Sequence, residues 1–178
     1  MKDVRILIID DDEAICRLLE QAFLAWGMTP KSITNPTLVA SEIEQHFYHI
    51  ILLDVRMPNM SGTELLQMIV AQSRDTKVIL ITGYADKEVA VTALRKGAFD
   101  LLEKPISLDF LSHVVNQALE VQATERQYQD TLMELRQSQE ALQVRTNRLE
   151  ALNRELTEIS SALSVLARSI ERVKQETE

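Results

Sequence analysis

Apolar positions follow two different periods along the first two thirds of the chain. Short apolar runs alternate with longer segments in which apolar residues recur every three or four positions. The apolar runs are residues 4–9, 28–33, 49–53, 77–82 and 99–102, of which the second is the weakest. The segments of helical period are residues 13–25, one that begins at Asn35-Pro36, residues 63–72, residues 86–96, and one after Pro105. The segment that begins at Asn35-Pro36 has Leu38, Val39, Ile43 and Phe47 on its apolar face. The pattern predicts five strands that alternate with five helices.

This alternation is typical of an α/β domain whose parallel sheet is covered by helices on both faces. The expected domain spans residues 1–120, and residues 121–178 form a separate helical extension. In parallel sheets of this kind, functional groups gather outside the C-terminal ends of the strands, near the point where the strand order reverses. The sequence therefore predicts a site at the strand ends.

The last third of the chain has the composition of a long helix. It contains no Gly, Pro, Trp, Phe or Cys, and helix-forming residues dominate it. From Leu149 onward, apolar residues are spaced alternately by three and four positions, which predicts a coiled coil. These seam residues are Leu149, Leu152, Leu156, Ile159, Leu163, Leu166, Ile170 and Val173. A parallel homodimer is expected rather than a single helix folded back on the domain, because a straight helix from Tyr128 to Val173 would reach roughly 70 Å.

A looser apolar seam precedes Leu149. Its residues are Tyr128, Leu132, Leu135 and Leu142, with the polar residues Gln139 and Thr146 at the intervening positions. The two seams meet at Leu149 in different phases. A discontinuity of this kind locally alters the supercoiling of a coiled coil.

Charge and cysteine content restrict the classes of partner. The chain carries a formal net charge of −8 and one cysteine. An acidic chain without a basic patch is not expected to bind nucleic acid or an anionic membrane directly. A single cysteine builds no disulfide framework, and the sequence shows neither a signal peptide nor an apolar run of about 18 residues, so a cytoplasmic location is expected.

Charged and hydroxyl side chains lie at or just beyond the ends of four of the predicted strands. They are Asp10-Asp11-Asp12, Asp54, Thr82 and Lys104. Crowded carboxylates repel one another unless a cation lies between them, and Mg²⁺ prefers such oxygen ligands. A lysine and a hydroxyl beside them suit an anion such as phosphate. The set predicts phosphoryl transfer to a carboxylate nucleophile, whereas Asp12 is expected to cap the helix that begins near Glu13.

Four stretches, IIDDDEAICRLLE, LLDVRMPNMSGTELL, VILITGYAD and KGAFDLLEKPI, resemble the receiver domain of two-component response regulators. The resemblance covers about residues 3–120 and implies a doubly wound, flavodoxin-like sheet of five strands. It implies a switch that receives its phosphoryl group from a sensor histidine kinase or a phosphotransfer protein. Such a chain is not a conventional enzyme, because it catalyses only its own phosphorylation and dephosphorylation.

The resemblance assigns roles to the residues at the strand ends. Asp54 matches the aspartate that accepts the phosphoryl group. Asp10 and Asp11 match the acidic pair that holds Mg²⁺ together with Asp54, and Arg56 matches the residue that offers its backbone carbonyl to the metal. Thr82 and Lys104 match the hydroxyl and the amine that contact the phosphoryl group.

Two features of the fifth strand and its end are also implied by the resemblance. The Lys104-Pro105 peptide matches one that is often cis in the family. Leu101 stands where the family commonly has Tyr or Phe, an aromatic ring that turns inward as the threonine moves. Leu101 is therefore expected to take part in the switch without the aromatic ring.

Other functions fit parts of the sequence. A structural dimerisation module with a vestigial acid site would use the coil and not the metal. A receiver segment of a hybrid kinase would also carry a long helix, although no histidine follows His113. A phosphatase with an aspartate nucleophile is disfavoured, because it needs an acid where Arg56 stands. The helix is expected to lead to an output domain, for which a helix-turn-helix DNA-binding domain is one candidate.

Overall fold

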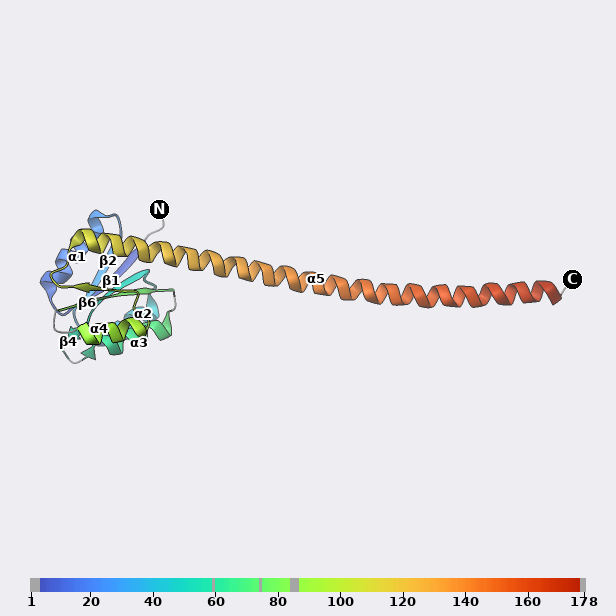
Figure 1. Cartoon of the computed structure of the whole chain (residues 1–178), viewed down its shortest axis with the longest axis horizontal. Helices are drawn as coiled ribbons and strands as arrows, with labels where there is room; N and C mark the ends of the chain where they lie inside the picture. Colours follow the sequence, from blue (N-terminus) through green and yellow to red (C-terminus); the bar gives the residue numbers. More distant parts are fainter. Residues whose placement is uncertain (1–3, 59, 74, 84–86, 177–178) are drawn as a thin grey trace. The chain divides into compact units, whose positions relative to one another are not determined.

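A parallel β-sheet forms the centre of the first part of the chain in the computed structural model (Figure 1). The structure describes residues 4–58, 60–73, 75–83 and 87–176, without the side chains of 87–90 and 170–176. Within these residues, the strands of the sheet are β1 (Arg5–Ile9), β2 (Thr29–Ile33), β3 (Ile50–Asp54), β6 (Lys77–Thr82) and β7 (Asp100–Glu103). They lie in the order β2-β1-β3-β6-β7, and every pairing is parallel. The doubly wound sheet expected from the sequence is confirmed.

Helices cover both faces of this sheet. They are α1 (Glu13–Ala25), the short 3₁₀ helix η1 (Pro36–Leu38), α2 (Val39–Gln45), α3 (Gly62–Gln72), α4 (Lys87–Arg95) and α5 (Leu108–Glu176). Figure 1 shows α1 and the first turns of α5 on one face and α2, α3 and α4 on the other. Asp12 caps α1 as expected, since its carboxylate accepts a hydrogen bond from the Ala14 N–H at 2.8 Å. The expected start of the fourth helix at residue 86 lies outside the described residues.

The strands divide the core into two apolar layers. Successive side chains of a strand point to opposite faces of the sheet. Ile6 and Ile8 therefore pack with α1 and α5, whereas Leu7 and Ile9 pack with α2, α3 and α4. Both layers are fully buried at these positions, which explains why β1 reads as a continuous apolar run.

The second helix differs from the expectation. The chain forms η1 and then a short α2 that ends at Gln45, not one helix that reaches Phe47. Val39 and Ile43 pack into the core as expected. Leu38 is 55% exposed and Phe47 is 38% exposed, so neither belongs to the buried face. Phe47 lies beyond the helix, where its ring makes an edge contact with His49 and stacks under the Arg126 guanidinium.

A small antiparallel hairpin follows Asp54 and was not predicted. Its strands are β4 (Arg56–Met57) and β5 (Met60–Ser61). Ser61 then begins α3 with a capping box, in which the Ser61 hydroxyl accepts from the Thr63 N–H and Glu64 accepts from the Ser61 N–H. The hairpin and the cap fix both ends of the loop that leaves the strand end at Asp54.

Two compact units divide the chain, Met1–Gln127 and Tyr128–Glu178. The second unit consists of the later part of α5. The seam residues from Leu149 to Leu166 are all exposed on this helix, and the side chains of Ile170 and Val173 lie outside the described residues. Pairing of the seam in a coiled coil stays a prediction. No helix among the described residues has the length and apolarity needed to span a lipid bilayer.

Candidate functional site

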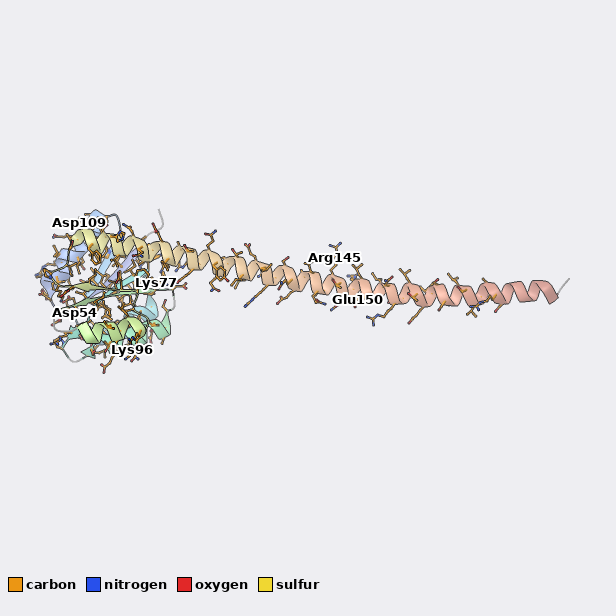
Figure 2. The ribbon with its side chains drawn as sticks, viewed as in Figure 1. Asp54, Lys77, Lys96, Asp109, Arg145 and Glu150 are labelled. Carbon is orange, nitrogen blue, oxygen red and sulfur yellow. The ribbon has the colours of Figure 1, made fainter. Side chains whose placement is uncertain are left out.

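Three carboxylates meet at the C-terminal edge of the sheet. Asp10 directly follows β1, and Asp54 is the last residue of β3, its neighbour in the sheet. Oxygen atoms of Asp10, Asp11 and Asp54 lie within 4.8 Å of one another. In the sheet, β1 has β2 on one side and β3 on the other. The cluster therefore lies at the point where the strand order reverses. Figure 2 shows Asp54 at the end of the sheet away from Lys77, with which β6 begins.

Lys104 directly follows β7 and brings a positive charge to this cluster from two strands beyond β3. Its Nζ lies 2.6 Å from Asp54 Oδ2 and 2.9 Å from Asp10 Oδ2. The Lys104 N–H donates to the Thr82 carbonyl at 2.8 Å, which holds the backbone beside β6. The Lys104-Pro105 peptide is cis, as the resemblance implies. One amine therefore bridges two carboxylates that come from separate strands.

Burial and pairing act against each other in the pKa values of this site. Burial raises the pKa of Asp10, while hydrogen bonds from the Asp12 N–H and from Lys104 oppose that effect without cancelling it. Burial by itself would lower the pKa of Lys104, but its hydrogen bonds to Asp54 and Asp10 outweigh burial and raise it. Lys104 therefore stays protonated at neutral pH and compensates part of the negative charge.

Backbone contacts fix the carboxylate of Asp54. The Arg56 N–H donates to Asp54 Oδ1 at 3.1 Å, so each oxygen of Asp54 accepts a hydrogen bond. The Val55 N–H donates to the Ile81 carbonyl at 2.9 Å, and the Gly62 N–H donates to the Val55 carbonyl at 3.1 Å. These bonds hold the residues after Asp54 against β6 and the start of α3. Asp54 is 5% exposed, so its carboxylate is presented at the edge with little freedom to move.

Comparison with known proteins decides the family. A family model described as "Response regulator receiver domain" matches residues 6–116. The chain belongs to this family. The receiver match covers all five strands of the sheet except Arg5 and includes the carboxylate cluster and Lys104.

Individual relatives agree with the family match. The receiver is 37% identical over 123 residues to the regulatory protein AtoC of Escherichia coli, covering 69% of this chain and 27% of AtoC. It is 37% identical over 117 residues to the C4-dicarboxylate transport transcriptional regulatory protein DctD of Pseudomonas aeruginosa, covering 66% of this chain and 25% of DctD. The chain thus spans about a quarter of the length of these curated relatives.

A solved structure has the same fold. The crystal structure of a CheY-like response regulator receiver domain protein from Methanospirillum hungatei superposes with a TM-score of 0.67 at 32% identity. The match covers 70% of this chain and 99% of that chain. This part of the sequence therefore corresponds to a whole receiver, and α5 continues beyond it.

The two residues expected to switch lie beside the cluster. Thr82 ends β6 and is 1% exposed. Its hydroxyl donates to the Gly83 carbonyl at 3.1 Å, so in this state it is engaged next to the receiver's carboxylates and not with them. Leu101 on β7 is half-buried and packs against the layer that faces α2, α3 and α4. Their movement on phosphorylation stays a prediction.

The donor set at the cluster fits Mg²⁺. Three carboxylates offer hard oxygen ligands from Asp10, Asp11 and Asp54 at short mutual distances. Asp11 is exposed, which leaves one side open to water and to a phosphoryl oxygen. Arg56 lies next to the cluster through its N–H bond to Asp54, and a role for its carbonyl stays a prediction.

Two supporting residues of the site were not assigned a role from the sequence. Cys16 on α1 donates its S–H to the Asp10 carbonyl at 3.3 Å, which ties the helix to the residue after β1. A Cβ atom at Gly62 would lie 2.2 Å from the Asp54 carbonyl oxygen. From the sequence, Cys16 is expected only to be a packing or surface residue and Gly62 only a loop residue, because both roles depend on contacts between separate segments.

Proposed function

We propose that this receiver accepts a phosphoryl group on Asp54 and passes the change to a dimeric coiled coil formed by α5. The observation that carries the proposal is the position of Lys104, which bonds to Asp54 and Asp10 together. A lysine held between two carboxylates is already placed to pair with an anion that arrives at Asp54. The donor is a phosphohistidine on a sensor kinase or on a phosphotransfer protein, as for response regulators generally.

The transfer needs one nucleophile and a set of positive or hydrogen-bonding groups. An oxygen of Asp54 attacks the phosphorus atom, and the bond from phosphorus to the donor's ring nitrogen breaks with its electron pair left on that nitrogen. Lys104 exchanges one of its carboxylate partners for a phosphoryl oxygen. The Thr82 hydroxyl turns from the Gly83 carbonyl to a second phosphoryl oxygen.

Asp10, Asp11 and Asp54 would hold Mg²⁺ beside this group, with the Arg56 carbonyl as a further ligand. The ion, when bound, neutralises charge on the phosphoryl oxygens. The residues of the chain supply the geometry: Asp10 is anchored by the Asp12 N–H at 2.9 Å and Asp54 by the Arg56 N–H. Anchored ligands keep the nucleophile in line with the incoming phosphorus.

The output of the switch is assigned to α5 and to a domain that α5 joins to the receiver. The exposed seam of the second unit supports a homodimer. AtoC is named a regulatory protein and DctD a transcriptional regulatory protein, which supports a DNA-binding output domain joined to this receiver, with no direct contact between this chain and nucleic acid. A histidine kinase as donor and a single free, buried cysteine support a cytoplasmic location.

Phosphoryl labelling tests the acceptor. With Mg²⁺ and acetyl phosphate, the wild-type chain is expected to gain one phosphoryl group by intact-mass spectrometry, and chelation of the metal abolishes the gain. Asp54→Asn removes the nucleophile and is expected to abolish labelling. Asp12→Asn is the matched control, since it makes the same chemical change at the same edge and an asparagine still caps α1.

Labelling of the Asp54→Asn variant at the wild-type level would overturn the assignment of the acceptor. Loss of labelling in the Asp12→Asn control would show that the edge as a whole had been disturbed. A wild-type chain that dimerises yet takes no phosphoryl group would be a structural dimerisation module with an inactive acid cluster.

A further inference from the structure

One apolar stripe runs through both seams of the second unit. Its residues recur at every seventh position: Tyr128, Leu135, Leu142, Leu149, Leu156 and Leu163. All six side chains are exposed on the helix, between 53% and 63%. A row of large apolar side chains at heptad spacing needs a partner that covers it.

A coiled-coil seam needs a second row of residues beside this stripe, and the helix offers two such rows. The residues three positions beyond each stripe residue form the three-residue flank: Thr131, Ser138, Arg145, Leu152, Ile159 and Leu166. The residues four positions beyond form the four-residue flank: Leu132, Gln139, Thr146, Asn153, Ser160 and Ala167. The three-residue flank is apolar only after Leu149, and before Leu149 it would bury the guanidinium of Arg145 in the seam. The four-residue flank avoids that charge and contributes Leu132.

The seam therefore changes flank at Leu149. Before that residue the stripe occupies heptad positions d, and after it the stripe occupies positions a. At 3.5 residues per turn, the exchange rotates the contacting face by about 50° around the helix. It corresponds to a three-residue discontinuity, which overwinds a coiled coil locally.

The first of these two registers places two opposite charges across the interface. Where Leu142 and Leu149 are d residues, Arg145 is at position g. Glu150, which directly follows the junction at Leu149, is at position e when the first register is continued to it. In a parallel, in-register pair of helices, g of one helix faces e of the next heptad of the other, five residues further on. Arg145 would thus face Glu150 of the second copy, twice in each dimer by symmetry.

The surroundings of Arg145 agree with a partner on another chain. The residues three and four positions away on its own helix are Ala141, Leu142, Arg148 and Leu149, none of which is acidic. Arg145 and Glu150 are both exposed and project from the helix surface (Figure 2). In an antiparallel pair, g faces g and e faces e, so the two charges would not meet.

We propose that two copies of this chain pair through α5 in parallel and in register, with Arg145 of each copy bonded to Glu150 of the other. The proposal rests on the dimeric output proposed above and specifies its partner, its direction and its register. Before Leu149, the ion pair favours the register in which the four-residue flank completes the seam. After Leu149, the leucine and isoleucine residues of the three-residue flank favour the other register. The junction at Leu149 is then the place where the two registers compete.

Charge reversal in the 178-residue chain tests the pair. In Arg145→Glu, two glutamates face each other at both symmetric contacts, and the dissociation constant of the dimer is expected to rise about 2- to 30-fold. Glu150→Arg is expected to have a similar effect. The double variant Arg145→Glu with Glu150→Arg restores opposite charges and is expected to return the constant to near the wild-type value. Fluorescence-detected sedimentation over a dilution series measures all of them.

Arg168→Glu is the matched control, because it makes the same charge change on the same helix at a position that points outward in both registers. It is expected to leave the dissociation constant unchanged. Equal effects of Arg145→Glu and Arg168→Glu, or no rescue in the double variant, would overturn the ion pair.

Disulfide formation tests direction and register independently. Thr146 is a seam residue in the proposed register, whereas Arg145 would be one in the competing register. Thr146→Cys is expected to cross-link the two copies rapidly under mild oxidation and Arg145→Cys slowly, while the native Cys16 is buried and stays reduced. The reverse order, or no cross-link in a chain whose mass is that of a dimer, would overturn the register alone. A monomer at every concentration would overturn the dimer as well, and labelling of Asp54 would still report on the phosphoryl acceptor.

Discussion

A glycine allows the loop after Asp54 to close against its own backbone. Gly62 is the first residue of α3, and its N–H reaches back to the Val55 carbonyl. A Cβ atom placed on Gly62 would lie 2.2 Å from the Asp54 carbonyl oxygen and 2.9 Å from the Val55 Cα. Both contacts are to backbone atoms, so no side-chain rotation relieves them. The backbone at Asp54 must move if this residue gains a side chain.

Gly62→Ala is therefore expected to lower both stability and phosphoryl labelling. Forced overpacking of this kind costs about 1 to 3 kcal/mol of unfolding free energy, and displacement of Asp54 slows labelling by acetyl phosphate. Urea unfolding followed by the fluorescence of Trp26, the single tryptophan of the chain, measures the first effect. Intact-mass labelling measures the second.

Gly27→Ala is the control for this prediction. Gly27 has a positive φ of 77° and no neighbour within 4 Å of an added Cβ, so the substitution adds only the local strain of a side chain on a left-handed backbone, about 1 to 2 kcal/mol. It should destabilise the receiver without slowing the labelling of folded protein. Normal labelling in Gly62→Ala would mean that the close approach of the two backbones does not position Asp54.

Glu42 on α2 has three hydrogen-bonding or ionic partners, away from the carboxylate cluster. Its carboxylate accepts from Lys31 Nζ at 2.6 Å and from the Tyr48 hydroxyl, and His46 Nδ1 lies 3.1 Å away. Partial burial acts to raise the pKa of Glu42, but the hydrogen bonds from Lys31 and Tyr48 outweigh it and lower the pKa. Burial and the same Glu42 contact raise the pKa of Tyr48 to about 12.

The lowered pKa of Glu42 makes part of the stability depend on pH. A carboxyl whose folded pKa is depressed contributes stability above its unfolded value, near 4.5, and this contribution is lost as the pH falls through the folded pKa. Glu42→Gln is expected to cost about 1 to 2 kcal/mol at pH 7, and the difference from wild type should shrink in acid. Urea unfolding at pH 7 and below pH 4 compares the two, and a difference that stays constant with pH would contradict the charge assignment.

Among the helices, α5 is fixed to the sheet by a buried amide. Gln122 is 4% exposed, and its Nε2 donates to the carbonyls of His49 and Asp75, just before β3 and β6. Beside it, Lys77 pairs with Glu125 at 2.5 Å. These contacts lie at the end of the sheet opposite to Asp54, so α5 is held there by polar bonds as well as by its apolar face.

Gln122→Ala is expected to destabilise the receiver by about 0.5 to 1.5 kcal/mol, because the Asp75 carbonyl loses its hydrogen bond from the buried Gln122 amide. The His49 carbonyl still accepts from the Lys77 N–H at 3.0 Å. Gln143→Ala on the same helix is the control: Gln143 is exposed, its amide contacts only Asn147, and its loss should change the stability by less than about 0.5 kcal/mol. Equal effects in urea unfolding would show that the buried amide contributes nothing specific.

The elements that could be predicted are those long enough to show a regular pattern of apolar residues. Residues 77–82 were expected as a strand and form β6, because the buried positions from Val78 to Ile81 form an unbroken apolar run. The hairpin of β4 and β5 was missed, since strands of two residues carry no alternation. The burial of Gln122 was also beyond reach, because its partners come from loops 47 and 73 residues away in the chain.

The candidate site was predictable to a similar extent and for a similar reason. Parallel strands present their C-terminal ends at one edge, so the convergence of Asp10, Asp54 and Lys104 followed from the pattern of strands. The pairing of Lys104 with both carboxylates did not follow, because Lys104 and Asp10 are 94 residues apart and their geometry depends on the whole sheet. Sequence pattern locates such groups on an edge, and only the packed sheet fixes which of them touch.

At the scale of the whole molecule, the second unit is helical, and none of its described side chains, up to residue 169, is buried. Most helical stability in proteins comes from packing of an apolar face and not from helix propensity. The described seam residues after Leu149 are exposed within one chain. Because this seam does not involve Asp54, the chain is expected to be a dimer both with and without beryllofluoride, a mimic of the phosphoryl group.

Two neighbouring residues of α5 separate a seam contact from general hydrophobicity. Leu163 and Val165 are 60% and 58% exposed, yet only Leu163 belongs to the seam. Leu163→Glu places two charges in the dimer interface and is expected to shift the mass measured by light scattering toward the monomer, whereas Val165→Glu is expected to leave a dimer. Equal masses for the two variants would contradict the seam. A wild-type mass that doubles only with beryllofluoride would mean that phosphorylation assembles the coil, whereas a constant dimer requires the signal to pass along α5 as a change of register or angle.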